Sequence, residues 1–135
     1  MTTATVRYFV DDLEEAVAFY RDTLGFEVEL RPSPMFAMLY RGDLRVLLSV
    51  PGGGSGGAPM PDGTAQGAGG WNRFALQVPD LEARVEELRG MGARFRNDIV
   101  AGVGVKQILL QDPAGNLIEL YQPLAAYHER PATNR

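Results

Sequence analysis

The sequence predicts an α+β fold made of two tandem β-α-β-β-β modules within one structural domain. The first observation is an internal repeat, in which Val10-Asp11-Asp12-Leu13 returns as Val78-Pro79-Asp80-Leu81 at the start of a second helical pattern. The second is that three short strand patterns follow each helix. The third is a length of 135 residues with 45% hydrophobic residues, which suits one domain with a real core. An internal duplication is the economical explanation.

The first module covers residues 1–50. Ala4 to Val10 alternates as a strand, and Asp12 is placed to cap a helix that ends at Gly25. After the helix, the pattern predicts three strands joined by short turns, over residues 26–30, 35–41 and 44–50.

Residues 51–70 are almost only glycine, proline, alanine, serine and short polar residues, which predicts a flexible linker too polar to pack. The glycine run 52–57 lacks the Lys-Ser/Thr pair and the helix of a phosphate loop, so it is a connector and a candidate lid. The second module, residues 71–123, repeats the first, and residues 124–135 form a C-terminal tail. After its helix from Leu81 to Gly90, strands are expected over 95–100, 105–110 and 117–121.

Charge and composition exclude several classes of partner. The net charge is −4 and no lysine or arginine block appears, which argues against nucleic acid. No cysteine is present, so disulfides and thiolate chemistry are excluded. No apolar run approaches the length of a membrane span, and the first residues lack the pattern of a signal peptide. We therefore expect a cytoplasmic protein that does not act at a membrane.

One stretch combines a tight turn with a carboxylate in a strand. Asp112-Pro113-Ala114-Gly115-Asn116 has the residues that a turn needs at each position. In the strand that follows, alternation puts Glu119 beside Tyr121 on the face opposite the wholly apolar one. A carboxylate at such a position needs a cationic partner, a metal or water.

The modules and two segments within them, Ala18 to Phe26 and Asp112 to Leu120, resemble the vicinal oxygen chelate superfamily over roughly residues 4 to 123. That superfamily includes glyoxalase I, extradiol dioxygenases, fosfomycin-resistance enzymes and bleomycin-resistance proteins. The resemblance implies a half-open, curved mixed sheet whose concave face holds the site. Fold alone does not fix the activity.

The metalloenzymes of this superfamily carry ligands on the first and last strand of each module. Counting from the repeated motif, the resemblance puts Thr5, Arg73 and Glu119 at three of these positions, and Leu47 at the fourth, unless the alignment slips to Val46. One carboxylate cannot hold a catalytic divalent ion, and a guanidinium repels it. The only histidine, His128, lies in the tail. The resemblance therefore implies no metal and no cofactor in this chain.

Alternation along the strands gives the remaining candidates for a ligand-binding face. Arg73 and Glu119 are expected to form a pair, either a structural ion pair that replaces the metal or a pair that meets the ligand. Trp71 is a stacking platform or a rim residue, and Phe36 and Tyr40 line a cavity or belong to the core, with the core favoured. The full set of predicted ligand-binding residues is Arg7, Phe9, Phe36, Tyr40, Arg45, Leu47, Ser49, Trp71, Arg73, Gln77, Glu119 and Tyr121.

Two classes of function follow. In the first, which the loss of ligands favours, the protein resembles the bleomycin-resistance type: a metal-free homodimer that sequesters a bulky, partly aromatic or polycyclic small molecule. In the second, it is a glyoxalase-like lyase or isomerase, with Glu119 as a metal-independent general base. Whether the modules pair within a chain or between chains stays open.

Overall fold

The computed structural model describes residues 4–124 and confirms the predicted α+β fold with two modules. The first module contains β1 (Ala4–Phe9), α1 (Leu13–Ala18), the π-helical turn η1 (Phe19–Thr23), β2 (Glu27–Ser33), β3 (Phe36–Arg41) and β4 (Leu44–Ser49). The second contains β5 (Arg73–Gln77), α2 (Leu81–Gly90), β6 (Arg94–Phe95), β7 (Val100–Ala101), β8 (Val105–Gln111) and β9 (Leu117–Pro123). His128 and most of the predicted tail lie outside the described residues.

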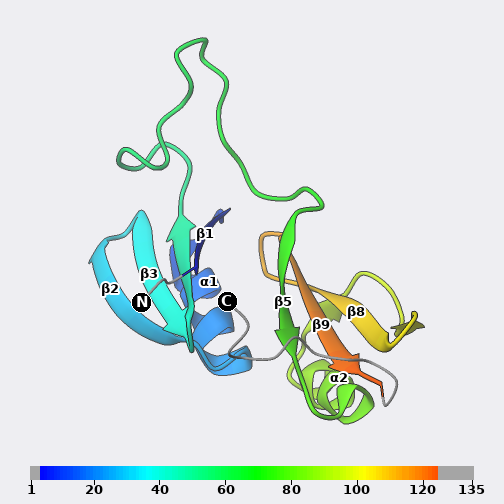
Figure 1. Ribbon diagram of the computed structural model, residues 1–135. Coiled ribbons are helices and arrows are strands. Elements are labelled where there is room, and N and C mark those ends of the chain that lie inside the picture. The colour runs from blue at the N-terminus through cyan, green and yellow to red at the C-terminus, as the bar shows by residue number, and fades with distance from the viewer. Residues whose placement is uncertain (1–3, 125–135) are drawn as a thin grey trace, which may run out of the picture.

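Each module forms its own mixed sheet, and the two sheets stand beside each other (Figure 1). The strand orders are β1-β4-β3-β2 and β5-β9-β8-β6, with β7 paired to β8. In both sheets the first and last strands of the module run parallel. The chain also leaves both first strands in the same way, since Val10 N–H donates to the Ser49 carbonyl at 3.0 Å and Val78 N–H to the Tyr121 carbonyl at 2.8 Å. The internal duplication predicted from the sequence is therefore also present in the strand pairing of the two sheets.

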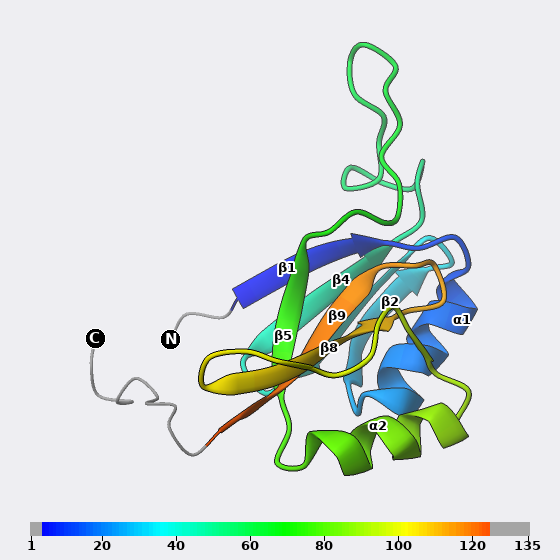
Figure 2. The ribbon, with the colours of Figure 1, turned by 90° about the vertical axis from the view of Figure 1, so that its right-hand side faces the viewer.

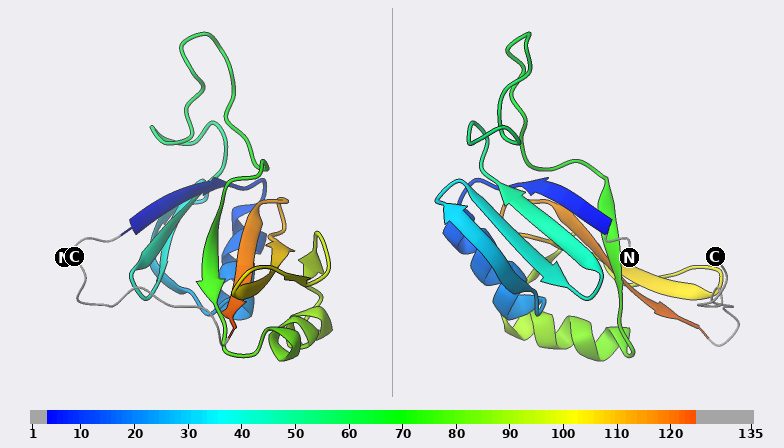
Figure 3. Two further views of the ribbon diagram at one scale, coloured as in Figure 1. Left: turned by 45° about the vertical axis from the view of Figure 1, so that its right-hand side comes forward. Right: turned by 60° about the vertical axis from the view of Figure 1, so that its left-hand side comes forward.

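Both helices begin after an aspartate cap, which was predicted at Asp12 and recurs at Asp80 of the repeated motif. The carboxylates of Asp12 and Asp80 each accept a hydrogen bond from the N–H three residues later, at 3.1 Å. Each helical segment is followed by a glycine with positive φ, 77° at Gly25 and 88° at Gly92, which other residues adopt only with strain. Helix α1 packs on β3 and β4, and α2 packs on β9 (Figure 3).

The first helix departs from the sequence prediction in its last turn. It widens into η1, and the N–H of Phe26 donates to the carbonyl of Tyr20 at 2.9 Å. The wider turn leaves Tyr20 fully buried, with its hydroxyl directed at the second module. Helical periodicity alone carries no signal for such a turn, since the same apolar spacing fits an ordinary α-helix.

Two predicted strands also differ. Strand β2 continues through Pro32, predicted to lie in a turn, because it is an edge strand with irregular register, where a proline costs no ladder hydrogen bond. The predicted strand over 95–100 is divided into β6 and β7. The reason is Asn97, whose side-chain oxygen accepts the N–H of Leu109 at 2.9 Å and so replaces a backbone partner in the ladder.

One hydrophobic core serves both modules. The helix-bearing faces of the two sheets contribute to it together, so the opposite faces of both sheets are the outer ones. From the strands, the fully or almost fully buried members include Leu39, Val46, Leu48, Ile108, Ile118 and Leu120.

The turn that opens β9 connects the modules. Asp112, 1% exposed, accepts a hydrogen bond from the Tyr20 hydroxyl at 2.8 Å and another from the Asn116 side-chain amide at 2.9 Å. Asn116 in turn donates to the Phe9 carbonyl at 2.7 Å. Burial raises the pKa of Asp112, while the hydrogen bonds from Asn116 and Tyr20 act in the opposite direction. The turn predicted from Asp112 to Asn116 therefore also forms a polar junction between the modules.

A second junction surrounds Tyr8 of β1. Its ring stacks on Phe74 of β5 at a centroid distance of 5.4 Å, and its hydroxyl donates to the Leu117 carbonyl at 2.6 Å and accepts the Phe74 N–H at 3.3 Å. Burial raises the pKa of Tyr8 to about 12. The edges of the two sheets thus meet inside one chain.

The connection 51–70 is only partly the linker that its composition predicts. Its first part is a closed turn, in which Gly57 N–H donates to the Gly53 carbonyl at 3.0 Å and Gly52 N–H to the Gly57 carbonyl at 2.7 Å. This part packs against Met35 and Arg7, so the expectation that it would not pack is wrong for residues 51–57. The middle of the connection rises away from both sheets (Figure 2), and its end returns to the second module, where the Gly69 N–H donates to the Asn116 side-chain oxygen at 2.8 Å. No helix of the described residues is long and apolar enough to cross a membrane.

Candidate functional site

The outer face of the first sheet carries the predicted residues of the first module. Because β1 and β4 run parallel in register, Arg7 lies opposite Leu47, and Phe9 lies opposite Ser49. On β3, Phe36 lies opposite Ser49 and extends the face. The alternation read from the sequence is confirmed, since Val46 and Leu48 on the other face are fully buried. The face thus combines the side chains of Thr5, Arg7, Phe9, Phe36, Met38, Tyr40, Arg45, Leu47 and Ser49.

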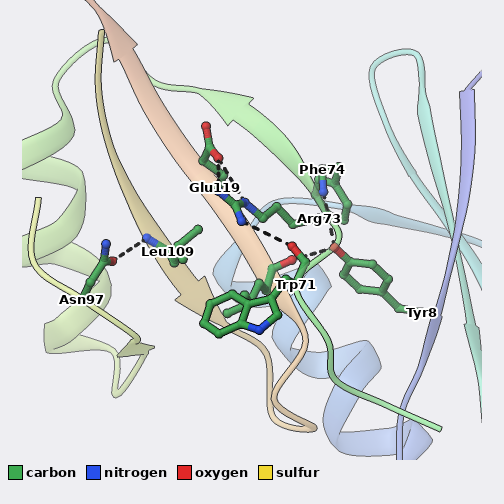
Figure 4. Close-up of polar contacts among 8 residues, drawn as sticks. Tyr8, Trp71, Arg73, Phe74, Asn97, Leu109 and Glu119 are labelled. Carbon is green, nitrogen blue, oxygen red and sulfur yellow. Dashed lines mark hydrogen bonds and ion pairs between the residues drawn. The ribbon is translucent and has the colours of Figure 1, made fainter. Parts of the chain in front are cut away.

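The outer face of the second sheet carries the predicted ion pair. Both Nε and Nη2 of Arg73 donate to one oxygen of Glu119, at 3.1 and 3.0 Å, and Nη1 donates to the Trp71 carbonyl at 3.3 Å (Figure 4). The side chains are 29% and 19% exposed, so the pair is partly shielded from water. The guanidinium holds the carboxylate that the resemblance puts at a metal-ligand position.

The register decides which residue of β4 matches Glu119. In the second module Ala75 pairs with Glu119, and in the first module Arg7, the counterpart of Ala75, pairs with Leu47. Val46 is fully buried on the opposite face, so the one-residue slip is excluded.

The four ligand positions therefore hold Thr5, Leu47, Arg73 and Glu119, and this set does not fit a divalent metal. A single carboxylate is present, and a cation already binds it. Within residues 4–124, no group of three or more histidine, cysteine, aspartate or glutamate side chains is placed to hold a metal ion.

Trp71 lies at the entrance to β5 with 61% of its surface exposed. The guanidinium of Arg96 lies over its indole ring at 4.7 Å from the centroid, a cation–π contact. Arg96 could not be predicted from the sequence, because the contact joins segments that only the fold brings together. One face of this stacking platform is thus already occupied. On the same sheet, the Tyr121 hydroxyl donates to Gln77 at 3.5 Å, a long contact.

Tyr40 and Arg45 are engaged by acidic residues of the edge strand β2, which sequence analysis did not single out. Arg45 donates to both oxygens of Glu29, at 3.0 and 3.3 Å. The negative charge of Glu27 raises the pKa of Tyr40, with smaller contributions from desolvation and from Glu29. Tyr40 is 36% exposed, so the prediction that it belongs to the core is wrong.

A pocket of about 290 Å³ lies between the first sheet and the glycine-rich turn. Phe36 is part of its wall, so the core prediction is wrong for this residue as well. The pocket includes the predicted residues Arg7 and Ser49, and residues that composition gave no reason to choose, namely Pro32, Ser33, Met35, Gly53, Gly54, Ser55 and Gly56.

The predicted site residues are divided between two faces. The pocket at Arg7 contains no residue of β5 or β9, and the ion pair of Arg73 and Glu119 lies wholly within the second sheet. The expectation of one concave face that combines all four ligand strands therefore does not hold within a single chain. The physical reason is the shared core, which places both helix-bearing faces inward.

Two β-α-β-β-β modules, each with parallel first and last strands, define the vicinal oxygen chelate fold. A family model described as the Glyoxalase/Bleomycin resistance protein/Dioxygenase superfamily matches residues 2–120, and the chain belongs to this superfamily. No protein of curated function matches the chain.

Solved structures agree with this assignment. A lactoylglutathione lyase from Agrobacterium tumefaciens is 26% identical, with a TM-score of 0.65 over 90% of this chain and 92% of that one. TnmS3, an antibiotic binding protein from Streptomyces sp. CB03234, is 22% identical, with a TM-score of 0.69 over 92% and 97%. A glyoxalase/bleomycin resistance protein/dioxygenase from Nocardioides is 22% identical, with a TM-score of 0.72 over 97% and 89%. At these identities the last two show the fold alone.

Proposed function

We propose that this protein is a metal-independent cytoplasmic binding protein that sequesters a bulky, partly aromatic natural product or antibiotic, as drug-resistance proteins do. The observation that carries the proposal is the ion pair of Arg73 and Glu119. A permanent cation stands at one ligand position and binds the only carboxylate among the four. The likeness to TnmS3 supports it, because that protein is described as antibiotic binding.

The outer faces suit such a ligand. They present aromatic and aliphatic side chains, including Phe36, Leu47 and Trp71, beside a few polar side chains. This combination is the usual lining of a small-molecule site. The predicted ligand-binding residues are proposed to contact the ligand from both faces.

We further propose a homodimer. The two faces lie on different sheets of one chain, and a second copy would bring the face of one first module against the face of another second module. Part of the surface that such an arrangement would cover is apolar, since Leu30 of the edge strand, which pairs with Met38 of the outer face, is 50% exposed. Light scattering at micromolar concentration should give twice the 14.7 kDa chain mass. A monomer mass that persists at high concentration contradicts the dimer.

The binding function is tested by a thermal-shift screen against polycyclic and glycopeptide antibiotics, together with elemental analysis. We expect at least one ligand to raise the melting temperature of dialysed protein that carries no stoichiometric transition metal. Phe36→Ala should weaken binding of that ligand, while Arg21→Met, at an exposed ion pair on η1, serves as the control. About one equivalent of tightly held zinc, nickel, manganese or iron would contradict the proposal.

A glyoxalase-like lyase or isomerase is the second candidate, because the lactoylglutathione lyase is similar over most of both chains. In that case Glu119 would act as general base after the ligand displaces Arg73. Lactoylglutathione formation would then be measurable in the metal-free protein and would be lost in Glu119→Gln. If the wild type shows no turnover and binds an antibiotic tightly, the protein is a sequestering protein and the lyase or isomerase function is rejected.

A further inference from the structure

The glycine-rich turn packs against the guanidinium of Arg7, an exposed residue on the outer face of the first sheet. Arg7 Nη1 donates to the Ser49 hydroxyl at 2.7 Å, and Ser49 is 1% exposed at the end of β4. The guanidinium carbon also lies 5.9 Å from the centre of the Phe36 ring. These contacts hold the cation on the wall of the 290 Å³ pocket.

Close packing against the turn fixes the guanidinium further. A Cβ added at Gly56 would stand 2.1 Å from Nη1 and 2.5 Å from the guanidinium carbon of Arg7. A Cβ at Gly53 would stand 2.5 Å from the Cβ of Met35. An alanine at Gly56 would therefore displace the end of the flexible Arg7 side chain, and one at Gly53 would meet the Cβ of Met35, so the two glycines let the turn approach the sheet and form the pocket.

No carboxylate of residues 4–124 forms an ion pair with the charge in the pocket. Among the described residues, seven lysine or arginine side chains form ion pairs with carboxylates, and Arg7 is not one of them. The pocket lining includes no acidic residue. Its apolar part consists of Pro32, Met35 and Phe36, so the lining combines one cation with an apolar wall.

We propose that this pocket binds the carboxylate of an organic anion, with an aromatic or apolar body against Phe36 and Met35. A guanidinium presents paired donors that match a carboxylate, and a fixed cation without a counterion favours an anion over a neutral group. At about 290 Å³ the pocket is at the lower end of small-molecule sites, which suits one end of a larger ligand or a bicyclic acid. The inference rests on the proposed binding function, since it names the chemistry of one part of the ligand.

The test compares 2-naphthoate with its neutral isostere 2-naphthamide by titration calorimetry on the full chain. We expect the acid to bind the wild type at least about tenfold more tightly than the amide, the effect of one charge-assisted contact. Arg7→Met should remove this preference and leave the weak binding of the amide unchanged. We expect 2-naphthyl phosphate to bind no more tightly than 2-naphthoate, and tighter binding of the phosphate would overturn the assignment of a carboxylate.

Two glycine variants make the test independent of Arg7 itself. Gly56→Ala should displace the guanidinium and weaken acid binding, whereas Gly67→Ala, with nothing within 4 Å of its added Cβ, should not. Melting temperatures establish that each variant is folded, and the uncharged Arg7→Gln replaces Arg7→Met if the methionine variant does not fold. Equal affinities for acid and amide, an unchanged preference in Arg7→Met, or no binding of the acid overturns the inference. A polycyclic ligand found in the thermal-shift screen would leave the proposed function standing in each of these cases.

Discussion

Arg73 is the residue that most limits the chemistry of this chain. A guanidinium keeps its charge at every physiological pH, so it cannot make room for a metal ion by losing a proton, as a lysine could. Its contacts with Glu119 and the Trp71 carbonyl use donors on three nitrogen atoms. The position therefore carries a permanent cation at a place where the resemblance puts a metal ligand.

The worth of this pair depends on its exposure. Buried ion pairs cost about 3 to 5 kcal/mol to break and exposed ones about 1 kcal/mol or less. With side chains 29% and 19% exposed, we expect Glu119→Gln and Arg73→Met each to lower the free energy of unfolding by about 1 to 2 kcal/mol. Urea denaturation with and without a bound ligand measures this effect.

The same variants separate the roles of the pair. A structural pair predicts a loss of stability whether or not ligand is present, and a general base predicts normal folding with lost turnover. In a sequestering protein where the pair meets the ligand, affinity would change more than stability. We expect the stability loss to dominate, and an unchanged free energy of unfolding in both variants would show that the pair contributes nothing.

At the scale of elements, the connection 51–70 after β4 is the segment whose structure the sequence predicts least well. Its composition predicts flexibility, because glycine has no side chain and serine only a small polar one. The structure uses those glycines for close approach instead, to Met35 at Gly53 and to Arg7 at Gly56. Both contacts depend on strand positions distant in sequence, so local composition could not reveal them.

Gly57→Ala tests this use of glycine. Its added Cβ would stand 2.5 Å from the Gly53 carbonyl oxygen and 2.8 Å from the Val50 carbonyl oxygen, and both are backbone atoms that cannot rotate away. We expect a loss of about 1 to 3 kcal/mol of stability, typical of overpacking. Gly67→Ala is the matched control and should be neutral in thermal denaturation. A neutral Gly57→Ala would mean that the turn adapts without cost.

The strands were easier to predict than the turns. Period-2 alternation put Arg7, Leu47 and Glu119 on their correct faces, because each strand has one buried side. The same pattern could not show that the two outer faces point away from a shared core, since alternation describes each sheet by itself. Nor could it show Arg96 over Trp71, a contact set by tertiary structure.

In the whole molecule, two polar junctions join the modules, at Asp112 and at Tyr8. At each junction burial raises the pKa of an acidic group, the Tyr8 hydroxyl at one and the Asp112 carboxylate at the other. Because the modules also share one hydrophobic core, we expect them to unfold together. The stability of the chain should consequently depend on the protonation of its junctions.

The pKa of Tyr8 determines whether the stability of the chain rises or falls with pH. Its pKa is about 12 in the folded protein against 10.0 ordinarily, so above about pH 10 the unfolded chain releases the phenol proton while the folded chain keeps it. The stabilisation is complete below pH 10 and is lost as the pH rises towards 12. Two pKa units correspond to about 3 kcal/mol.

Tyr8→Phe isolates this contribution. At neutral pH the variant should be less stable by about 1 to 2 kcal/mol, because the Leu117 carbonyl and the Phe74 N–H lose their partner. Between about pH 9 and pH 11.5 its stability should fall less steeply than that of the wild type. Urea denaturation across this range measures both slopes, and identical slopes would show that Tyr8 ionises as an ordinary phenol.

The outer part of the connection 51–70 has a practical consequence. Its hydrogen bonds are local, from Met60 to Thr64 and from Gln66 to Ala58, and it rises clear of both sheets (Figure 1). Insertions are best tolerated where exposed backbone bonds only to itself. The tip around Asp62 and Gly63 is accordingly the position for an affinity tag, a fluorophore or a grafted peptide. A reporter carried there would not alter a strand.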